Sequence, residues 1–183
     1  ENSSHFGGSL STVEIISTLF MKYMNINFDK FSKNRNRFIL SKGHSCLAYY
    51  AALSELNYFS SSDLLNFEGN DSKLLGHPVM NRQMGIEFST GSLGMGLGLG
   101  VGVALALKKK NMENHVYVLI GDGECNEGSI WESANSAASF DLNNITCILD
   151  NNKFQQTGSN IEIMSMGNLS EKWKSFGWNV LNV

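Results

Sequence analysis

The amino-acid sequence predicts an α/β fold, in which a mostly parallel sheet is covered by helices on both faces. Residues 115–120 and 145–149 are apolar runs rich in β-branched side chains, the composition of strands buried on both faces. Residues 129–140, between these runs, are rich in Ala and Ser and suit a helix. A strand, a helix and a second strand in this order predict a parallel crossover unit.

Further helices are expected on either side of this unit. The sequence pattern predicts helices over residues 12–24, 46–58, 91–110 and 169–176, a short helix capped at Ser62 and Asp63, and a strand beginning in residues 178–183. Asn168 suits the start of the helix over 169–176, and Gly177 suits its end.

The helix over 91–110 is rich in glycine. Its apolar stretch, 93–107, has 15 residues, whereas a membrane-spanning helix needs about 20. We therefore interpret it as a buried helix whose glycines permit close packing, rather than as a dimerisation face within a membrane. The first residues show no secretory signal, so the protein is not expected at or beyond a membrane.

The composition indicates a single domain over residues 1–183, large enough to fold without disulfides or a structural metal. The net charge is 14 − 17 = −3, which argues against nucleic acid as the main partner. Charged residues make up only 17% of the chain against roughly 25% on average, which indicates that another chain covers part of the surface. Three cysteines without a metal or redox spacing indicate a reducing compartment, the cytoplasm.

Polar side chains follow both strands of the crossover unit. Asp122 comes after the first strand and Asn152 after the second, 152 − 122 = 30 residues later. The carboxyl ends of parallel strands meet at one edge of the sheet, where α/β proteins bind ligands. A carboxylate and an amide oxygen suit Mg²⁺, with further positions left for a diphosphate. Gly121 and Gly123 present no side chain to obstruct a phosphate, and the helix starting near Ser129 would direct its positive end at it.

Other kinds of site fit this segment less well. Gly-Asp-Gly by itself is typical of an ordinary turn between a strand and a helix. A P-loop is excluded because Ser129 stands where the motif has Lys, and an EF-hand because Glu127 stands where it requires Gly. The helix over 91–110 contains no G-x-G-x-x-G, so a nicotinamide site is unsupported.

Gly-Asp-Gly followed about 30 residues later by Asn-Asn resembles the thiamine diphosphate-binding motif. The surrounding motifs occur in the order seen in transketolases: SHFGGSL at 4–10, LSKGH at 40–44, LGHP at 75–78, STGSLG at 89–94 and GDGECNEG at 121–128. The chain most resembles the amino-terminal subunit of split transketolases, in which the diphosphate-binding and pyrimidine-binding domains are separate chains. Relative to that family, we expect it to be trimmed at both ends.

The resemblance implies roles for individual residues. Asp122, the side chain of Asn152 and the main-chain carbonyl of Phe154 would bind Mg²⁺, or alternatively Ca²⁺ or Mn²⁺. The residues that would contact thiamine diphosphate are His44, Gly91, Ser92, Leu93, Gly121, Gly123, Glu124 and Asn152. His5 and His77 would act on the sugar in the substrate channel, and Glu127 would lie at a subunit interface and help to pass protons between active sites.

These assignments have structural alternatives. Each histidine could be a structural or surface residue, and for His115, at the head of a strand, we prefer that interpretation. His5, His44 and His77 adjoin Gly-rich segments, where the backbone can approach a ligand closely. Histidine also suits proton transfer near neutral pH, which favours a functional role for these three.

Three features depart from the family. Phe6 stands where Pro usually follows the first histidine, and Ser92 stands where larger transketolases have Pro. No residue of this chain corresponds to the glutamate that activates the aminopyrimidine ring, which the family places in the pyrimidine-binding domain. The chain is therefore expected to hold part of an active site, completed by that domain in a dimer or heterotetramer.

The expected activity is transfer of a two-carbon ketol unit from a ketose phosphate to an aldose. Two alternatives remain open. One is another thiamine diphosphate enzyme, such as deoxyxylulose phosphate synthase, and the other is a non-catalytic, transketolase-like partner.

Overall fold

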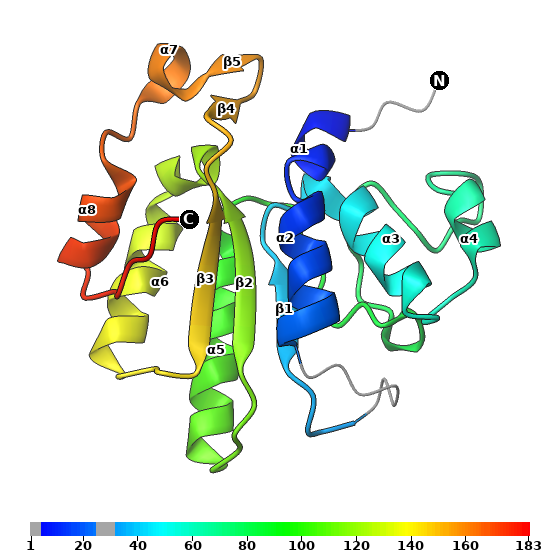
Figure 1. Cartoon of the computed structure of the whole chain (residues 1–183), viewed down its shortest axis with the longest axis horizontal. Coiled ribbons are helices and arrows are strands. Elements are labelled where there is room, and N and C mark those ends of the chain that lie inside the picture. The colour runs from blue at the N-terminus through cyan, green and yellow to red at the C-terminus, as the bar shows by residue number, and fades with distance from the viewer. Residues whose placement is uncertain (1–4, 25–31) are drawn as a thin grey trace.

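A parallel three-stranded sheet organises the part of the chain that the computed structural model describes, residues 5–24 and 32–183. Its strands are β1 (Arg37–Leu40), β2 (Val116–Gly121) and β3 (Ile145–Asp150), in the order β1-β2-β3 (Figure 1). The register pairs Gly121 with Asp150, so β2 and β3 end side by side. The predicted α/β class and the parallel crossover are thus confirmed.

Helices and short turns occupy most of the remaining chain. The α-helices are α1 (Phe6–Leu10), α2 (Val13–Thr18), α3 (Cys46–Glu55), α4 (Ser61–Leu65), α5 (Met95–Lys109), α6 (Gly128–Ser139), α7 (Asn160–Met164) and α8 (Leu169–Ser175). A π-helical turn, η1 (Leu19–Tyr23), extends α2, and 3-10 turns lie at η2 (Gly43–Ser45), η3 (Arg82–Met84) and η4 (Gly123–Asn126). A small antiparallel pair, β4 (Phe154–Gln155) and β5 (Gly158–Ser159), follows β3.

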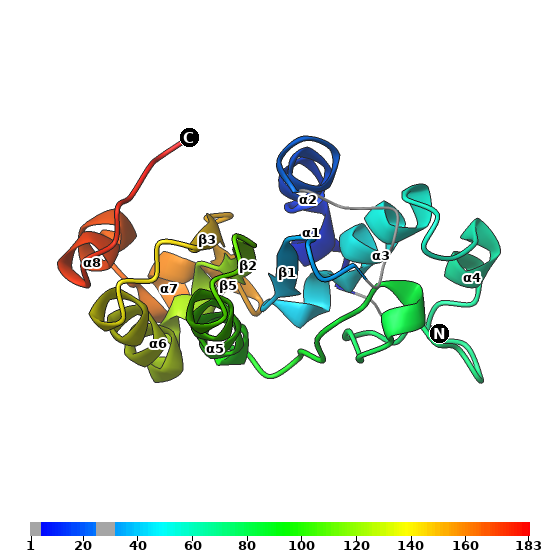
Figure 2. The same ribbon diagram turned by 90° about the horizontal axis from the view of Figure 1, so that it is seen from below.

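The hydrophobic core forms two layers, one on each face of the sheet. Alternate residues of a strand point to opposite faces. Phe38 and Leu40 accordingly pack with α2 and α3, whereas Ile39 packs with α5 and α6. Figure 2 shows the same arrangement, with α2 on one side of the strands and α5 and α6 on the other. Helices on both faces leave the carboxyl edge of the sheet as the place where polar side chains gather.

The glycines of α5 allow the helix to lie close to the sheet. A Cβ on Gly96 would collide with the Ser41 side chain, and one on Gly100 would lie 2.5 Å from Val118 Cγ2. The structure therefore supports the prediction of a closely packed helix. Within the described residues, no helix is both long and apolar enough to cross a membrane.

Several predicted boundaries differ from the observed ones. The helix expected over 91–110 starts at Met95, because Gly94 has φ +80° and cannot belong to it. The helix over 61–65 is capped by Ser60 through a capping box with Asp63, so the predicted cap at Ser62 is wrong. Asn168 and Gly177 do bound α8 as predicted, since the Asn168 side chain accepts from the Glu171 N–H and Gly177 has φ +85°.

The strand predicted over residues 178–183 is absent. Trp178 Nε1 donates to the Ala134 carbonyl of α6, and its ring packs edge-on against Trp173 of α8 at 5.0 Å. Trp178 thus packs against α6 and α8, and residues 178–183 do not pair with β3. Without a further strand beside it, β3 is an edge strand of the described sheet, and its Thr146 is exposed. The prediction that both strands are buried on both faces is therefore wrong for β3, whereas in β2 only Tyr117 is not fully buried.

Two alanine substitutions in α5 test the close packing. Gly100→Ala places a methyl group against Val118, whereas Gly102→Ala meets nothing within 4 Å. Both gain the same helix propensity, about 1 kcal/mol, so the difference between them isolates the packing cost. We expect Gly100→Ala to be less stable than Gly102→Ala by about 1–3 kcal/mol in urea unfolding. Equal stabilities would show that α5 can move away from β2.

Candidate functional site

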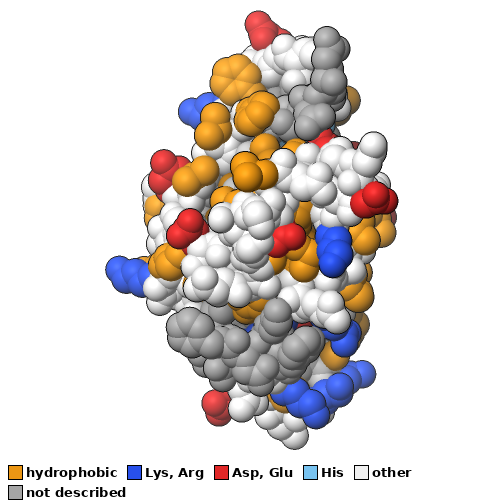
Figure 3. Space-filling model, turned by 90° about the vertical axis from the view of Figure 1, so that its right-hand side faces the viewer, with side chains coloured by type: hydrophobic (Ala, Val, Ile, Leu, Met, Phe, Trp, Pro, Cys, Tyr) orange, Lys and Arg blue, Asp and Glu red, His pale blue; other side chains and the backbone are white. Residues whose placement is uncertain are grey.

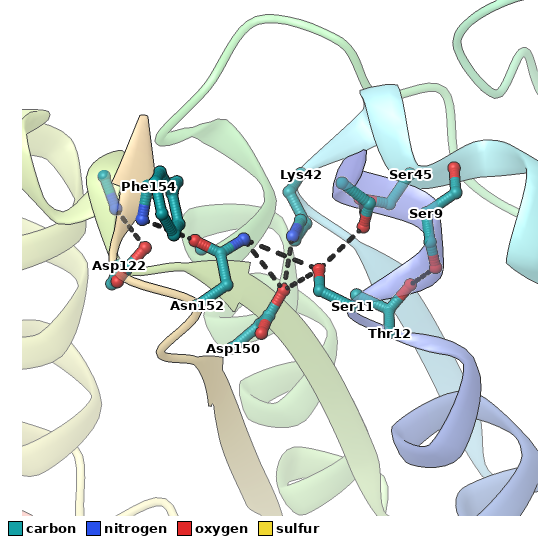
Figure 4. Close-up of polar contacts among 12 residues, drawn as sticks. Ser9, Ser11, Thr12, Lys42, Ser45, Asp122, Asp150, Asn152 and Phe154 are labelled. Atoms are coloured by element: carbon teal, nitrogen blue, oxygen red, sulfur yellow. Dashed lines mark hydrogen bonds and ion pairs between the residues drawn. The ribbon is translucent and has the colours of Figure 1, made fainter. Parts of the chain in front are cut away.

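A cluster of polar side chains lies at the carboxyl edge of the sheet (Figure 4). Asp122 directly follows β2, Asp150 ends β3, and Asn152 lies two residues further on. The β2–β3 ladder continues into this region, where the Asp122 N–H donates to the Asp150 carbonyl at 3.1 Å. The predicted meeting of Asp122 and Asn152 at one edge therefore follows directly from the register of two parallel strands.

Asp122 is a buried carboxylate held by backbone groups. Its side chain is 1% exposed, and its Oδ1 and Oδ2 accept from the N–H groups of Gly123, at 2.8 Å, and Lys153, at 2.7 Å. Burial raises the pKa of Asp122 above its ordinary value, and these two hydrogen bonds oppose the rise. Among the described residues no Lys, Arg or His forms an ion pair with it. A bound cation would offset the cost of burying this charge, so the residue fits a metal ligand.

Asn152 presents its amide oxygen on the same side. Asn152 Oδ1 accepts from the Phe154 N–H at 2.9 Å, and Figure 4 shows Asn152 between Asp122 and Phe154 on one side and Lys42 and Ser11 on the other. Within the described residues, no group of three His, Cys, Asp or Glu side chains could hold a metal. A cation here would therefore rely on a carboxylate, an amide, a main-chain carbonyl and ligand oxygens, the donor set that suits Mg²⁺ better than Zn²⁺.

Gly123 allows the close approach of β4, the first strand of the small antiparallel pair. A Cβ on Gly123 would lie 2.6 Å from Gln155 Cβ, so only glycine allows η4 and β4 to approach this closely. Between Asp122 and α6 the chain forms η4, and the expected approach of the amino end of α6 to a phosphate stays a prediction. The amino end of α6 contacts Gly94, whose carbonyl accepts from Ser129 Oγ at 3.0 Å.

Glu124 joins three segments beneath the site. Its Oε1 accepts from Ser41 Oγ and from the Gly94 N–H at 2.8 Å, and its Oε2 accepts from the Gly121 N–H at 3.1 Å. Burial raises the pKa of Glu124, which is 3% exposed, and these hydrogen bonds work against that rise. The side chain has little surface to offer a ligand. The side chain holds the 91–94 loop against the ends of β1 and β2, and the cofactor contact expected of Glu124 stays a prediction.

Three histidines from separate segments form a second cluster. His5 precedes α1, His44 lies in η2 and His77 lies in the loop before η3. The His5 ring centroid is 5.5 Å from that of His44 and 6.4 Å from that of His77. All three line a pocket of about 60 Å³, together with residues that include Cys46, Phe67 and Glu68. The three histidines for which we expected a function thus meet, whereas His115 lies apart on the sheet beside Thr146.

The loop of Gly91, Ser92 and Leu93 packs against the segments that carry His44 and His77. A Cβ on Gly43 would lie 3.0 Å from the Gly91 nitrogen, and one on Gly91 would lie 3.5 Å from the His77 side chain. The 3-10 turn η2, the loop and the His77 segment are therefore packed closely. Glu127 is exposed at the start of α6, beside Gly94, and stands outside the histidine pocket.

His44 is neutral at physiological pH. Its pKa is lowered from 6.5 to about 4, chiefly by burial and then by the charges of Lys42, His5 and His77, while Asp150 acts in the opposite direction. A neutral imidazole can both donate and accept a hydrogen bond. His44 can therefore bind a polar ligand atom of either kind.

Sequence reasoning missed three polar residues of the carboxyl edge. Lys42 is 1% exposed, and its Nζ lies 2.6 Å from Asp150 Oδ2, which also accepts from Ser11 Oγ at 2.6 Å. A lysine two residues after the buried run 38–40 was a usable signal, because a strand end places it at the edge of the sheet. Its partner could not be named without knowing the strand order.

The pH dependence of stability tests the environment of His44. The unfolded chain binds a proton at this residue below pH 6.5, whereas the folded chain binds it only near pH 4. The free energy of unfolding should therefore fall as the pH is lowered from 6.5 to 4, and less steeply in His44→Gln. Urea unfolding at several pH values measures both slopes, and above pH 6.5 the two profiles should run parallel. Equal slopes below pH 6.5 would contradict the lowered pKa.

The chain matches the family described as "Transketolase, thiamine diphosphate binding domain" over residues 1–183. It is 42% identical over 177 residues to one subunit of the apulose-4-phosphate transketolase of Actinobacillus succinogenes, covering 96% of this chain and 64% of the relative. It is 41% identical to the 6-deoxy-6-sulfo-D-fructose transketolase subunit SqwG of Clostridium sp. (strain MSTE9), covering 98% and 66%. The chain thus spans about two thirds of the length of these two relatives.

Solved structures agree with this assignment. The transketolase from Leishmania mexicana superimposes with a TM-score of 0.84 and 28% identity, covering 97% of this chain and 29% of the larger one. Human transketolase is 36% identical over 183 residues, again with only 29% of the human chain covered. The buried Asp122, the adjacent Asn152 and the histidine cluster therefore lie in a chain that belongs to the transketolase family, as its thiamine diphosphate-binding domain.

Proposed function

We propose that this chain is the cofactor- and metal-binding subunit of a transketolase, which transfers a two-carbon ketol unit from a ketose phosphate to an aldose. The observation that carries the proposal is the buried Asp122 carboxylate beside the Asn152 amide oxygen, at the adjacent ends of two parallel strands. The family assignment supplies the cofactor class, thiamine diphosphate.

Each part of the cofactor has candidate contacts. Asp122, Asn152 Oδ1 and the Phe154 carbonyl would hold Mg²⁺, or Ca²⁺ or Mn²⁺ in its place, against the diphosphate. Backbone groups at Gly121 and Gly123 and the loop of Gly91, Ser92 and Leu93 would contact the remainder, with His44 beside them. When bound, thiamine diphosphate supplies the stabilisation of a carbanion, and the protein supplies orientation and electrostatics.

The histidine pocket is the proposed binding place for the sugar. His5 and His77 would form hydrogen bonds with its hydroxyl and carbonyl oxygens, and histidine is suited to moving a proton at these atoms. The pocket holds imidazole rings beside the Glu68 carboxylate, a mixture that can serve polyol hydroxyl groups as both donor and acceptor.

A second chain would complete the active site. Related chains are named as single subunits of transketolases, and they extend well beyond the length matched here. Apolar side chains are exposed on α1 and α2, where Phe6, Leu10 and Val13 are 61%, 67% and 44% exposed. Figure 3 shows further hydrophobic side chains on the face that carries α4, whose Leu65 is 90% exposed. We propose that the partner is a pyrimidine-binding subunit, in a cytoplasmic dimer or heterotetramer, with Glu127 at the interface.

Removing the proposed metal ligand should abolish metal-dependent cofactor binding. Asp122→Asn keeps the size of the side chain but removes the charge that attracts the cation. We expect calorimetry to show heat for thiamine diphosphate with Mg²⁺ in the unmodified chain and none in the variant. Asp141→Asn is the matched control, because Asp141 is exposed and its φ of +48° suits asparagine. Undiminished binding in Asp122→Asn would refute the metal assignment.

Ketol transfer should require two chains. Mixing this chain with a pyrimidine-binding transketolase subunit, in the presence of thiamine diphosphate, Mg²⁺ and an aldose acceptor, should consume xylulose 5-phosphate, and neither chain alone should do so. Full activity of this chain by itself would contradict the division of the active site. Use of pyruvate in place of xylulose 5-phosphate would indicate a synthase, and a mixture that binds the cofactor without turnover would indicate a non-catalytic partner.

A further inference from the structure

We infer that Lys42, Asp150 and Ser11 are positioning residues that set which way the Asn152 carboxamide faces. This inference rests on the proposed function, because it concerns the side chain that would present its oxygen to the cation. Neither the family motif nor the relatives assign a role to this trio. The contacts of one amide group carry the inference.

The trio is built around one carboxylate oxygen. Asp150 Oδ2 accepts hydrogen bonds from Lys42 Nζ at 2.6 Å and from Ser11 Oγ at 2.6 Å. Asn152 Nδ2 also donates to this oxygen, at 3.4 Å. The side chains of Lys42 and Asp150 are only 2% and 7% exposed. Figure 4 shows these contacts converging between β3 and the segment that carries Ser11. The ion pair joins the segment after β1 to the end of β3, and the Ser11 hydrogen bond adds the turn between α1 and α2.

The Asn152 amide has only one favourable orientation between its neighbours. On one side Asp150 Oδ2, which accepts from Lys42 and Ser11, is an acceptor, so the amide must present its NH₂ group. On the other side the Phe154 N–H only donates, so the amide must present its oxygen. Turning the amide around would place oxygen against oxygen and NH₂ against N–H. Asp150 thereby directs Asn152 Oδ1 away from itself, toward the side of Asp122 (Figure 4).

Lys42 holds Asp150 in the position that this arrangement needs. A buried carboxylate without a partner would be costly, and a buried ion pair adds little net stability while its geometry is demanding. Outer contacts of this kind orient the groups that bind a metal, and their removal typically lowers metal affinity by 10–100-fold. We therefore expect the ion pair to affect cation binding more than folding.

The test measures cation binding directly on the full chain. Mn²⁺ is titrated in the presence of thiamine diphosphate and followed by electron paramagnetic resonance, with the thermal unfolding midpoint recorded without ligand. The wild-type chain and Asp122→Asn come first, because absence of Mn²⁺ binding in the wild type would overturn the proposed function itself. Binding that is lost in Asp122→Asn establishes the site on which the inference is then tested.

Asp150→Asn should lower Mn²⁺ affinity by 10–100-fold, because an amide at this position can face Asn152 with either its oxygen or its NH₂ group. The double variant Lys42→Met/Asp150→Asn removes both buried charges, so it should recover the unfolding midpoint while the Mn²⁺ affinity stays low. The exposed pair of Lys174 and Glu171, 2.9 Å apart, is the matched control, and Lys174→Met/Glu171→Gln should leave the affinity unchanged.

Two outcomes would overturn the inference. If the double variant recovers Mn²⁺ affinity together with stability, the ion pair serves folding alone. If Lys42→Met weakens the binding of inorganic pyrophosphate without metal as strongly as it weakens Mn²⁺ binding, Lys42 contacts phosphate directly and is not acting through Asn152.

Discussion

The register between β2 and β3 is the constraint on which the rest of the site depends. Because Gly121 pairs with Asp150, both strands end at the same level of the sheet. Asp122 and Asn152, which follow these ends, therefore lie close together at its carboxyl edge. A shift of β2 by one residue would turn its side chains to the opposite faces of the sheet. The apolar layers on both faces prevent such a shift, since Val116, Val118 and Ile120 must all face α5 and α6. Ordinary core packing thus determines where the candidate metal ligands lie.

The order of the strands explains what could and could not be predicted. Asp122 and Asn152 were predictable because strand, helix and strand imply adjacent parallel strands, whose carboxyl ends coincide. The partner of Lys42 was not, because β1 is far away in sequence and its place beside β2 is visible only in the folded chain. The prediction of a strand also failed at residues 178–183, where the Trp178 indole donates to the Ala134 carbonyl of α6, a contact between distant residues that the sequence pattern does not reveal.

The histidine cluster shows a different limit of sequence reasoning. His5, His44 and His77 lie in three connecting segments, and no periodic pattern relates them. Their grouping depended on family resemblance until the structure placed the rings of His44 and His77 within 6.4 Å of that of His5. The close contacts of Gly8 with His44 and of Gly43 with Gly91 give the physical reason, because larger residues would force these segments apart.

Buried charge is concentrated at one edge of the molecule. Lys42, Asp122, Glu124 and Asp150 are all buried, and all lie where the strands end. Replacing such groups by apolar ones would often leave stability unchanged or improve it, so a folding role alone does not account for their position. Each instead fixes a neighbour: Glu124 holds the Gly94 N–H, and Lys42 holds Asp150, which faces the Asn152 amide. This edge is therefore organised to keep oxygen and N–H groups in place before a ligand arrives, which reduces the reorganisation that binding would otherwise require.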